Sequence, residues 1–209
     1  MVKINLLIEG GNPSENSDIL TIGNNAVLRQ SFNEFFTRLL SRNDIGVSLG
    51  FGYRNAAKEF SGNNDIDFLF VDSDTSPQNL ETWFVKIEED QNPIIIPENR
   101  KKNVIFMIQE MEAWFLKQPE CILKWSAVNG FKRLHPKESL EQHSLLQNNI
   151  EQVSKPSQKL YDIIKHFFER DGKKIKYNKM KDSPGLIDSL DPIELMKIDI
   201  QLQNFVKQV

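Results

Sequence analysis

The chain has 209 residues, of which 39% are hydrophobic and 26% charged, and its formal net charge is −3. These values predict one sizeable core with a small satellite: an α/β core over residues 1–130 and a helical extension over residues 131–209 packed on it. Cys121 is the only cysteine, which excludes a disulfide framework and a cysteine metal cluster and favours a reducing cytoplasm.

Apolar runs and helical periodicities alternate along the first two thirds of the chain. The first run, at 4–8, soon meets Glu9, so it is too short and polar for a signal peptide or a membrane span. We therefore expect a cytoplasmic protein with no membrane contact. Further runs predict strands at 47–51, 65–71 and 104–108, and the segment from Gly10 to Asn25 predicts a long loop.

Helices are expected between these strands and throughout the last third of the chain. The predicted helices are 26–42, a turn at 55–60, a helix begun by Ser76 and Pro77, short helices at 110–116 and 119–125, a helix from Pro156 to Gly172, and short helices after Pro184 and Pro192. From about residue 130 the whole chain is expected to be helical. The alternation of strands and helices predicts an α/β fold with a mainly parallel sheet and helices on both faces.

Carboxylates follow three of the predicted strands, at the point where each strand ends. They are Glu9, Asp72 with Asp74, and Glu110 with Glu112. Because the carboxyl ends of parallel strands meet at one edge of a sheet, we expect these side chains to gather there. Carboxylate oxygens are the ligands that Mg²⁺ or Mn²⁺ prefers, and a divalent ion would relieve their mutual repulsion.

Each of these residues also has an ordinary structural interpretation. Aspartates after a strand often make turns or cap helices, and a glutamate that opens a helix is favoured by the helix dipole. The pattern does not decide between Glu110 and Glu112. Arg54, in a glycine-rich turn, could hold a phosphate or lie on the surface. His135, His143 and His166 show no metal-ligand spacing and are expected to be ordinary residues.

Charge is distributed unevenly along the chain. Residues 65–120 carry twelve acids against five bases, a balance of −7, whereas residues 155–181 carry nine bases against three acids, a balance of +6. An acidic metal site beside a basic segment suits a phosphate-bearing substrate, although a solvated helix face and a basic loop would give the same pattern. The sequence contains no GxSxG, GxxxxGK[ST] or GxGxxG motif, which argues against an ATPase or a dehydrogenase.

The sequence resembles the Toprim-like superfamily, the fold shared by topoisomerases, bacterial primases and OLD-type nucleases. The resemblance rests on LLIEGG, which contains Glu9, and on FLFVDSDTS, which contains Asp72 and Asp74. A closer likeness is to a Toprim-like family of unknown function in bacteria and archaea. It rests on the segments LRQSFNEFF, GYRNAAKEF, MIQEMEAWFL, KPSQKL and KYNKMKDSPGLIDSLDP.

The resemblance implies roles for named residues. Glu9, Asp72 and Asp74 match the acidic set of the superfamily, and the closer family's own motifs add Arg54, Glu112, Tyr177 and Lys179. Lys179 is followed by Met180, where that family often has glycine, so the position of its side chain is left open. The resemblance also implies association with an ABC-type or OLD-type ATPase.

Three hypotheses for function follow. The first is a Mg²⁺-dependent phosphodiester hydrolase, a nuclease of phage defence or nucleic-acid processing, in which Glu9, Asp72 and Asp74 bind metal while Arg54 and Lys179 hold phosphates of DNA or RNA. The second is a Toprim-like subunit that docks on an ATPase or on nucleic acid without catalysis. The third, a nucleotide phosphotransferase or primase-like enzyme, is disfavoured because the sequence has no nucleotide-binding motif.

Overall fold

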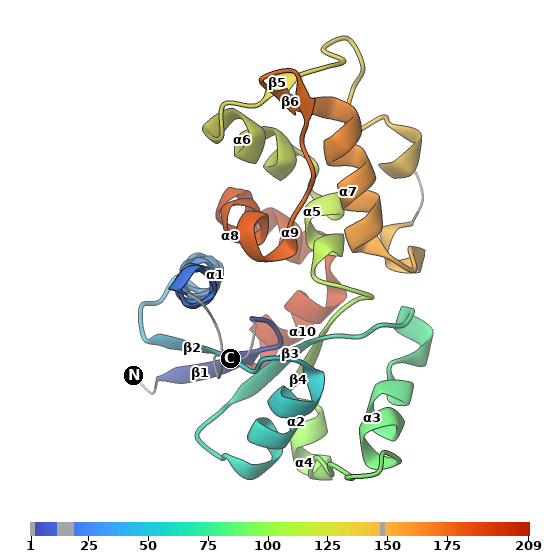
Figure 1. Cartoon of the computed structure of the whole chain (residues 1–209). Helices are drawn as coiled ribbons and strands as arrows, with labels where there is room; N and C mark the ends of the chain where they lie inside the picture. Colours follow the sequence, from blue (N-terminus) through green and yellow to red (C-terminus); the bar gives the residue numbers. More distant parts are fainter. Residues whose placement is uncertain (1–2, 12–18, 147–148) are drawn as a thin grey trace.

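The computed structural model of the chain describes residues 3–11, 19–146 and 149–209. At its centre is a four-stranded, fully parallel sheet in the order β2-β1-β3-β4 (Figure 1). The strands are β1 (Ile4–Ile8), β2 (Ile45–Leu49), β3 (Phe68–Asp72) and β4 (Val104–Met107). The predicted α/β class and parallel sheet are therefore confirmed.

Helices cover both faces of this sheet, because its strands are apolar on both sides. One face, which includes Leu7, Leu69 and Phe106, packs against α2 (Tyr53–Gly62) and α3 (Glu81–Glu88). The short helix α4 (Glu98–Lys101) lies on the same side (Figure 1). The other face packs against α1 (Ile19–Leu40) and α10 (Ile200–Gln208).

The remaining elements form a lobe beside the sheet, joined to it by α8 and α9 (Figure 1). The lobe contains α5 (Glu112–Lys117), α6 (Glu120–Val128), α7 (Pro156–Phe167) and an antiparallel sheet in the order β5-β6-β7. The three short strands are Lys132–Arg133, Phe168–Arg170 and Lys173–Lys174. The helices α8 and α9 span Lys179–Ser189 and Pro192–Ile198. Short 3-10 turns occur at Pro77–Asn79 (η1), Ser144–Leu146 (η2) and Ile150–Gln152 (η3).

The expectation of a wholly helical chain from about residue 130 is wrong, because the lobe contains this antiparallel sheet. Two expected helix boundaries in the lobe are also wrong. The helix from Pro156 ends at Phe167 instead of Gly172, because the chain turns extended at Phe168 and pairs with β5. The helix expected after Pro184 begins five residues earlier. Asn178 caps it by accepting a hydrogen bond from the Lys181 N–H, and the proline is tolerated inside the helix at the cost of one backbone hydrogen bond.

The segment expected to be a long loop after β1 is also partly wrong. Residues 12–18 lie outside the described residues, but α1 already begins at Ile19 and continues through Gly23, Asn24 and Asn25. These residues have low helix propensity, yet each costs less than about 1 kcal/mol once a long helix has formed. Within the described residues, every helix is too short or too polar to cross a membrane.

Candidate functional site

Two carboxylates meet where the central strands β1 and β3 end. Glu9 directly follows β1, Asp72 is the last residue of β3, and the two strands are hydrogen-bonded neighbours. The Asp72 backbone N–H donates a hydrogen bond of 3.0 Å to Glu9 Oε2, and the Glu9 N–H donates one of 2.7 Å to the carbonyl of Phe70. Parallel register thus places both side chains at one edge of the sheet, as the sequence predicts.

Asp74 is held at the same edge by an unusual backbone turn. Its N–H donates to the carbonyl of Gln109 at 2.9 Å, and the Gln109 N–H donates to Ser73 Oγ at 2.8 Å. Asp74 and Gln109 have positive φ angles of 52° and 62°, a conformation that costs energy for residues other than glycine. Lys86 Nζ lies 3.4 Å from Asp74 Oδ2, and both side chains are exposed.

Glu112 and Lys179 complete the cluster from the β4 side. Glu112 is fully buried, Lys179 is exposed along about half of its side chain, and Lys179 Nζ lies 3.2 Å from both Asp72 Oδ2 and Glu112 Oε2. The Tyr177 hydroxyl donates to Glu112 Oε1 at 3.0 Å. Although it is near Lys179, Glu112 Oε2 has no hydrogen-bond partner among the described residues. The Lys179 ammonium balances the charge of this oxygen, which can still accept a further donor or cation.

Burial and like charge raise the pKa values of the two strand-end carboxyls. The pKa of Glu9 rises to about 8, chiefly through desolvation and then through repulsion from Asp72. The pKa of Asp72 rises to about 6, again chiefly through desolvation, while Lys179 opposes the rise. The carboxylates of Asp72 and Glu112 in turn raise the pKa of Lys179, against the effect of its own desolvation. The environment of this edge therefore destabilises the ionised, negatively charged forms of Glu9 and Asp72.

Two residues named from the sequence lie apart from this cluster. Arg54, in the first turn of α2, forms an ion pair with Asp90 and donates to the carbonyl of Asn92 at 2.8 Å, so its guanidinium has partners on the segment after α3. Glu110 accepts a 2.6 Å hydrogen bond from the Ser157 N–H in the first turn of α7. Of the two glutamates that the sequence could not separate, Glu112 joins Asp72 through Lys179, whereas Glu110 caps a helix.

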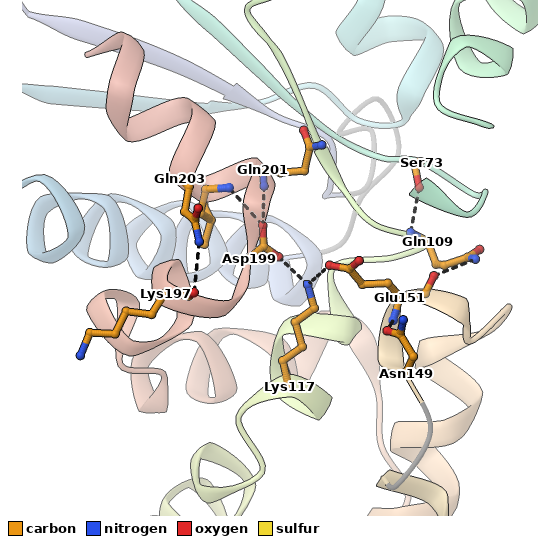
Figure 2. Close-up of polar contacts among 10 residues, drawn as sticks. Ser73, Gln109, Lys117, Asn149, Glu151, Lys197, Asp199, Gln201 and Gln203 are labelled. Atoms are coloured by element: carbon orange, nitrogen blue, oxygen red, sulfur yellow. Dashed lines mark hydrogen bonds and ion pairs between the residues drawn. The ribbon is translucent and has the colours of Figure 1, made fainter. Parts of the chain in front are cut away.

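A buried lysine of α5 joins two parts of the lobe to the segment before α10. Lys117 Nζ lies 2.8 Å from Glu151 Oε1 in η3 and 2.9 Å from Asp199 Oδ2 (Figure 2). Asp199 also caps α10 by accepting from the N–H groups of Gln201 and Leu202. The same close-up shows Gln109, from the strained turn, directed toward the backbone of Glu151.

A second polar cluster was not expected from the sequence. Glu138, His143 and His166 bring their ligand atoms within 4.8 Å of one another, at the end of α7 in the lobe. The sequence predicts ordinary histidines, because His135, His143 and His166 show no metal-ligand spacing with one another, and nothing in it marks Glu138 as a ligand. Their approach depends on how a loop folds over α7.

The comparisons with known proteins identify a family without identifying an activity. A family described as a domain of unknown function, DUF4276, matches residues 19–209. The chain belongs to the DUF4276 family. No curated protein and no solved structure matches it. The family match contains Asp72, Asp74, Glu112 and Lys179 and begins after Glu9, and it does not report a Toprim assignment.

Proposed function

We propose that this DUF4276 protein is a Mg²⁺-dependent phosphodiester hydrolase that cleaves nucleic acid. One observation carries the proposal. Glu9 and Asp72, at the ends of adjacent parallel strands, are hydrogen-bonded to one another, and both have raised pKa values. Groups perturbed in this way cluster at functional sites, and open α/β sheets bind ligands at this edge.

The residues present fit a divalent cation. The carboxyls of Glu9, Asp72, Asp74 and Glu112 carry four negative charges when ionised, and Lys179 and Lys86 supply only two positive ones. The all-oxygen ligand set suits Mg²⁺ or Mn²⁺, and it includes a Glu112 oxygen that accepts no hydrogen bond among the described residues. Glu9, Asp72 and Asp74 would hold the ion, with Glu112 beside them. When bound, such an ion activates water and stabilises a leaving oxygen.

The protein's own groups supply the other functions of such a site. Without a cation, burial and Asp72 raise the pKa of Glu9 to about 8, so the Glu9 carboxyl would release a proton when it binds an ion. Asp72 is oriented by the Met111 N–H, which donates to its Oδ1 at 2.8 Å. Lys179 Nζ lies between Asp72 and Glu112 at the end of a half-exposed side chain, from which it can hold a substrate phosphate.

A basic groove provides a path for the rest of a nucleic acid. It is an open depression of about 570 Å³ at the start of α7, lined by Lys155 and Lys159 together with polar side chains and Asp162. Glu110 joins this end of α7 to the segment that follows β4. We propose that Lys155 and Lys159 contact backbone phosphates, because Arg54, the other candidate, is already paired with Asp90.

A non-catalytic subunit that docks on an ATPase is the second candidate. The ion pairs of Lys179 favour it, because they partly neutralise Asp72 and Glu112 without any metal. Both candidates are consistent with a Toprim-like arrangement of Glu9 and the Asp72-Ser73-Asp74 segment, and with action in phage defence, which we retain as proposals. Only the first requires hydrolysis.

The test is cleavage of plasmid, single-stranded DNA and RNA by purified protein, with Mg²⁺, with Mn²⁺ and with chelator. Glu9→Gln keeps the hydrogen bond from Asp72 but removes the charge, so metal-dependent cleavage should fall by at least about 10³-fold, or roughly 4 kcal/mol. Glu110→Gln is the matched control, since its amide oxygen can still accept from Ser157. Cleavage by Glu9→Gln at the wild-type rate, or no cleavage by the wild type on any substrate, contradicts the proposal.

A further inference from the structure

The Glu138, His143 and His166 cluster joins a loop to the end of a helix. Glu138 and His143 lie in the segment between β5 and η2, and His166 lies in the last turn of α7. The segment is anchored at its start, where the Leu134 N–H donates to the Phe167 carbonyl at 2.8 Å and Arg133 donates to the Glu138 carbonyl. The three side chains are thus brought together by a supported backbone.

Two separations within the cluster are close to those between the ligand atoms of one metal ion. His166 Nε2 lies 3.1 Å from Glu138 Oε2, and His143 Nε2 lies 3.7 Å from Glu138 Oε1. Zinc bonds of about 2.0–2.1 Å in a tetrahedron place neighbouring ligand atoms about 3.4 Å apart. Both observed separations, which involve different oxygens of Glu138, differ from that value by a few tenths of an ångström. All three ligand atoms lie within 4.8 Å of one another, so a bound ion would draw them closer together.

We propose that Glu138, His143 and His166 bind one Zn²⁺ ion, with a fourth coordination position open to solvent. Two imidazoles and one carboxylate are a known zinc ligand set, and they differ from the all-oxygen set at the edge of the parallel sheet. Glu138 and His166 have side chains about 40% exposed, so an ion can enter from solvent. The ion would fasten the segment around Glu138 to α7.

Zinc binding requires the proton between Glu138 and His166 to leave. In the hydrogen bond of 3.1 Å between them, the proton lies on His166 Nε2, where a metal would need the lone pair. On binding, this proton moves to the Nδ1 position or, from a doubly protonated ring, to solvent, and the carboxylate oxygen then faces the cation. No other bond changes.

His135 supplies a control inside the same group of rings. Its ring stacks on that of His166, with centroids 4.5 Å apart and planes at 21°, so it contacts the ligand through its face. It is not one of the three residues whose ligand atoms converge. Replacing it removes an exposed imidazole next to the site without removing a proposed ligand.

The experiment is competition for Zn²⁺ between the full chain, stripped with chelator, and a micromolar chromophoric indicator. The wild type and His135→Gln should each bind one equivalent, and His143→Gln/His166→Gln should bind at least about 100-fold more weakly. Melting of all three proteins in chelator should be alike, since the replaced rings are not in the core. A double variant that competes as well as the wild type overturns the site, and so does a wild type that does not compete.

The assignment is separable from the proposed nuclease site. Asp72→Asn/Asp74→Asn, which removes charge from the edge of the parallel sheet, should bind Zn²⁺ as the wild type does. Loss of the zinc equivalent in that variant would place the ion at the sheet edge and overturn the Glu138, His143 and His166 assignment, whatever the cleavage assay shows.

Discussion

The edge of the parallel sheet and the Glu138, His143 and His166 cluster collect ligand atoms in different ways. At the sheet edge, neighbouring strands end side by side, so backbone register brings Glu9 and Asp72 into contact. In the lobe, a loop crosses the end of α7, and side chains with no shared register meet. Glu9 and Asp72 are largely buried, and their burial destabilises their ionised forms. Glu138 and His166, in contrast, are open to solvent.

Of these two kinds of site, only the one built at strand ends can be recognised in a sequence. Strand ends are visible as apolar runs, and in a parallel sheet each carboxylate that follows a run is placed at the same edge. A loop that closes over a helix leaves no periodicity, so its ligands are found only in the folded chain. Variants in each region can show whether the two are as separate as their construction indicates.

Lys117→Met should give the largest loss of stability, because Lys117 joins the lobe to the sheet side of the molecule (Figure 2). Asp199, only 1% exposed, would lose its cationic partner, and breaking such a buried pair costs about 3 kcal/mol. For a chain of this size the melting temperature should fall by roughly 6 to 12 °C, measured by calorimetry.

Lys197→Met is the matched control for that measurement. Its ion pair with Glu194 joins two side chains that are each 57% exposed, so the free energy of unfolding should change by less than about 1 kcal/mol. If the two lysine variants melt at the same temperature, the Lys117 contacts do not stabilise the attachment of the lobe. The lobe and the sheet are then less coupled than the contacts in Figure 2 indicate.

Mg²⁺ should stabilise the wild type through the sheet edge alone. At about ten times its dissociation constant, an ion that binds only the folded chain adds about 1.4 kcal/mol, or roughly 4 °C in melting temperature. Asp72→Asn/Asp74→Asn should lose most of this increment, and His143→Gln/His166→Gln should keep it. Equal increments in the wild type and the aspartate variant would remove Asp72 and Asp74 from the metal site.

Lys155→Ala/Lys159→Ala should have the smallest effect, on the salt dependence of nucleic-acid binding. Each lost phosphate contact lowers the slope of log K against log salt by about 0.9 for duplex DNA, so the double variant should lose about 1.8. Lys173→Ala/Lys174→Ala removes the same charge from exposed β7 and serves as the control. If the wild type and the Lys155 and Lys159 variant have the same slope of log K against log salt, the groove does not contact nucleic acid.

Much of the central fold was predictable because its signals are local. The apolar runs before Glu9 and Asp74 gave strands in the right places, and the parallel arrangement followed from the helices between them. The convergence of Glu9 and Asp72 followed in turn. The partner of Arg54 could not be predicted, because its ion pair with Asp90 joins the first turn of α2 to the segment after α3, 36 positions along the chain.

The lobe was harder to predict for a physical reason. Its strands β5 and β7 have two residues each, too few to show an alternating pattern, and they exist because they pair with β6. The start of α8 at Lys179 is likewise set by the Asn178 cap, although Pro184 suggested a later start. These elements depend on contacts with distant parts of the chain, which the local sequence does not indicate.

The position of Phe205 has a consequence for how the chain is made. Its fully buried ring packs against Phe36, Phe68 and Phe70, so α10 closes a face of the sheet built from residues much earlier in the chain. During synthesis that aromatic face stays uncovered until residue 205 has left the ribosome. Exposed apolar surface in such an intermediate favours aggregation, so the nascent chain is an expected client of chaperones until α10 has been synthesised.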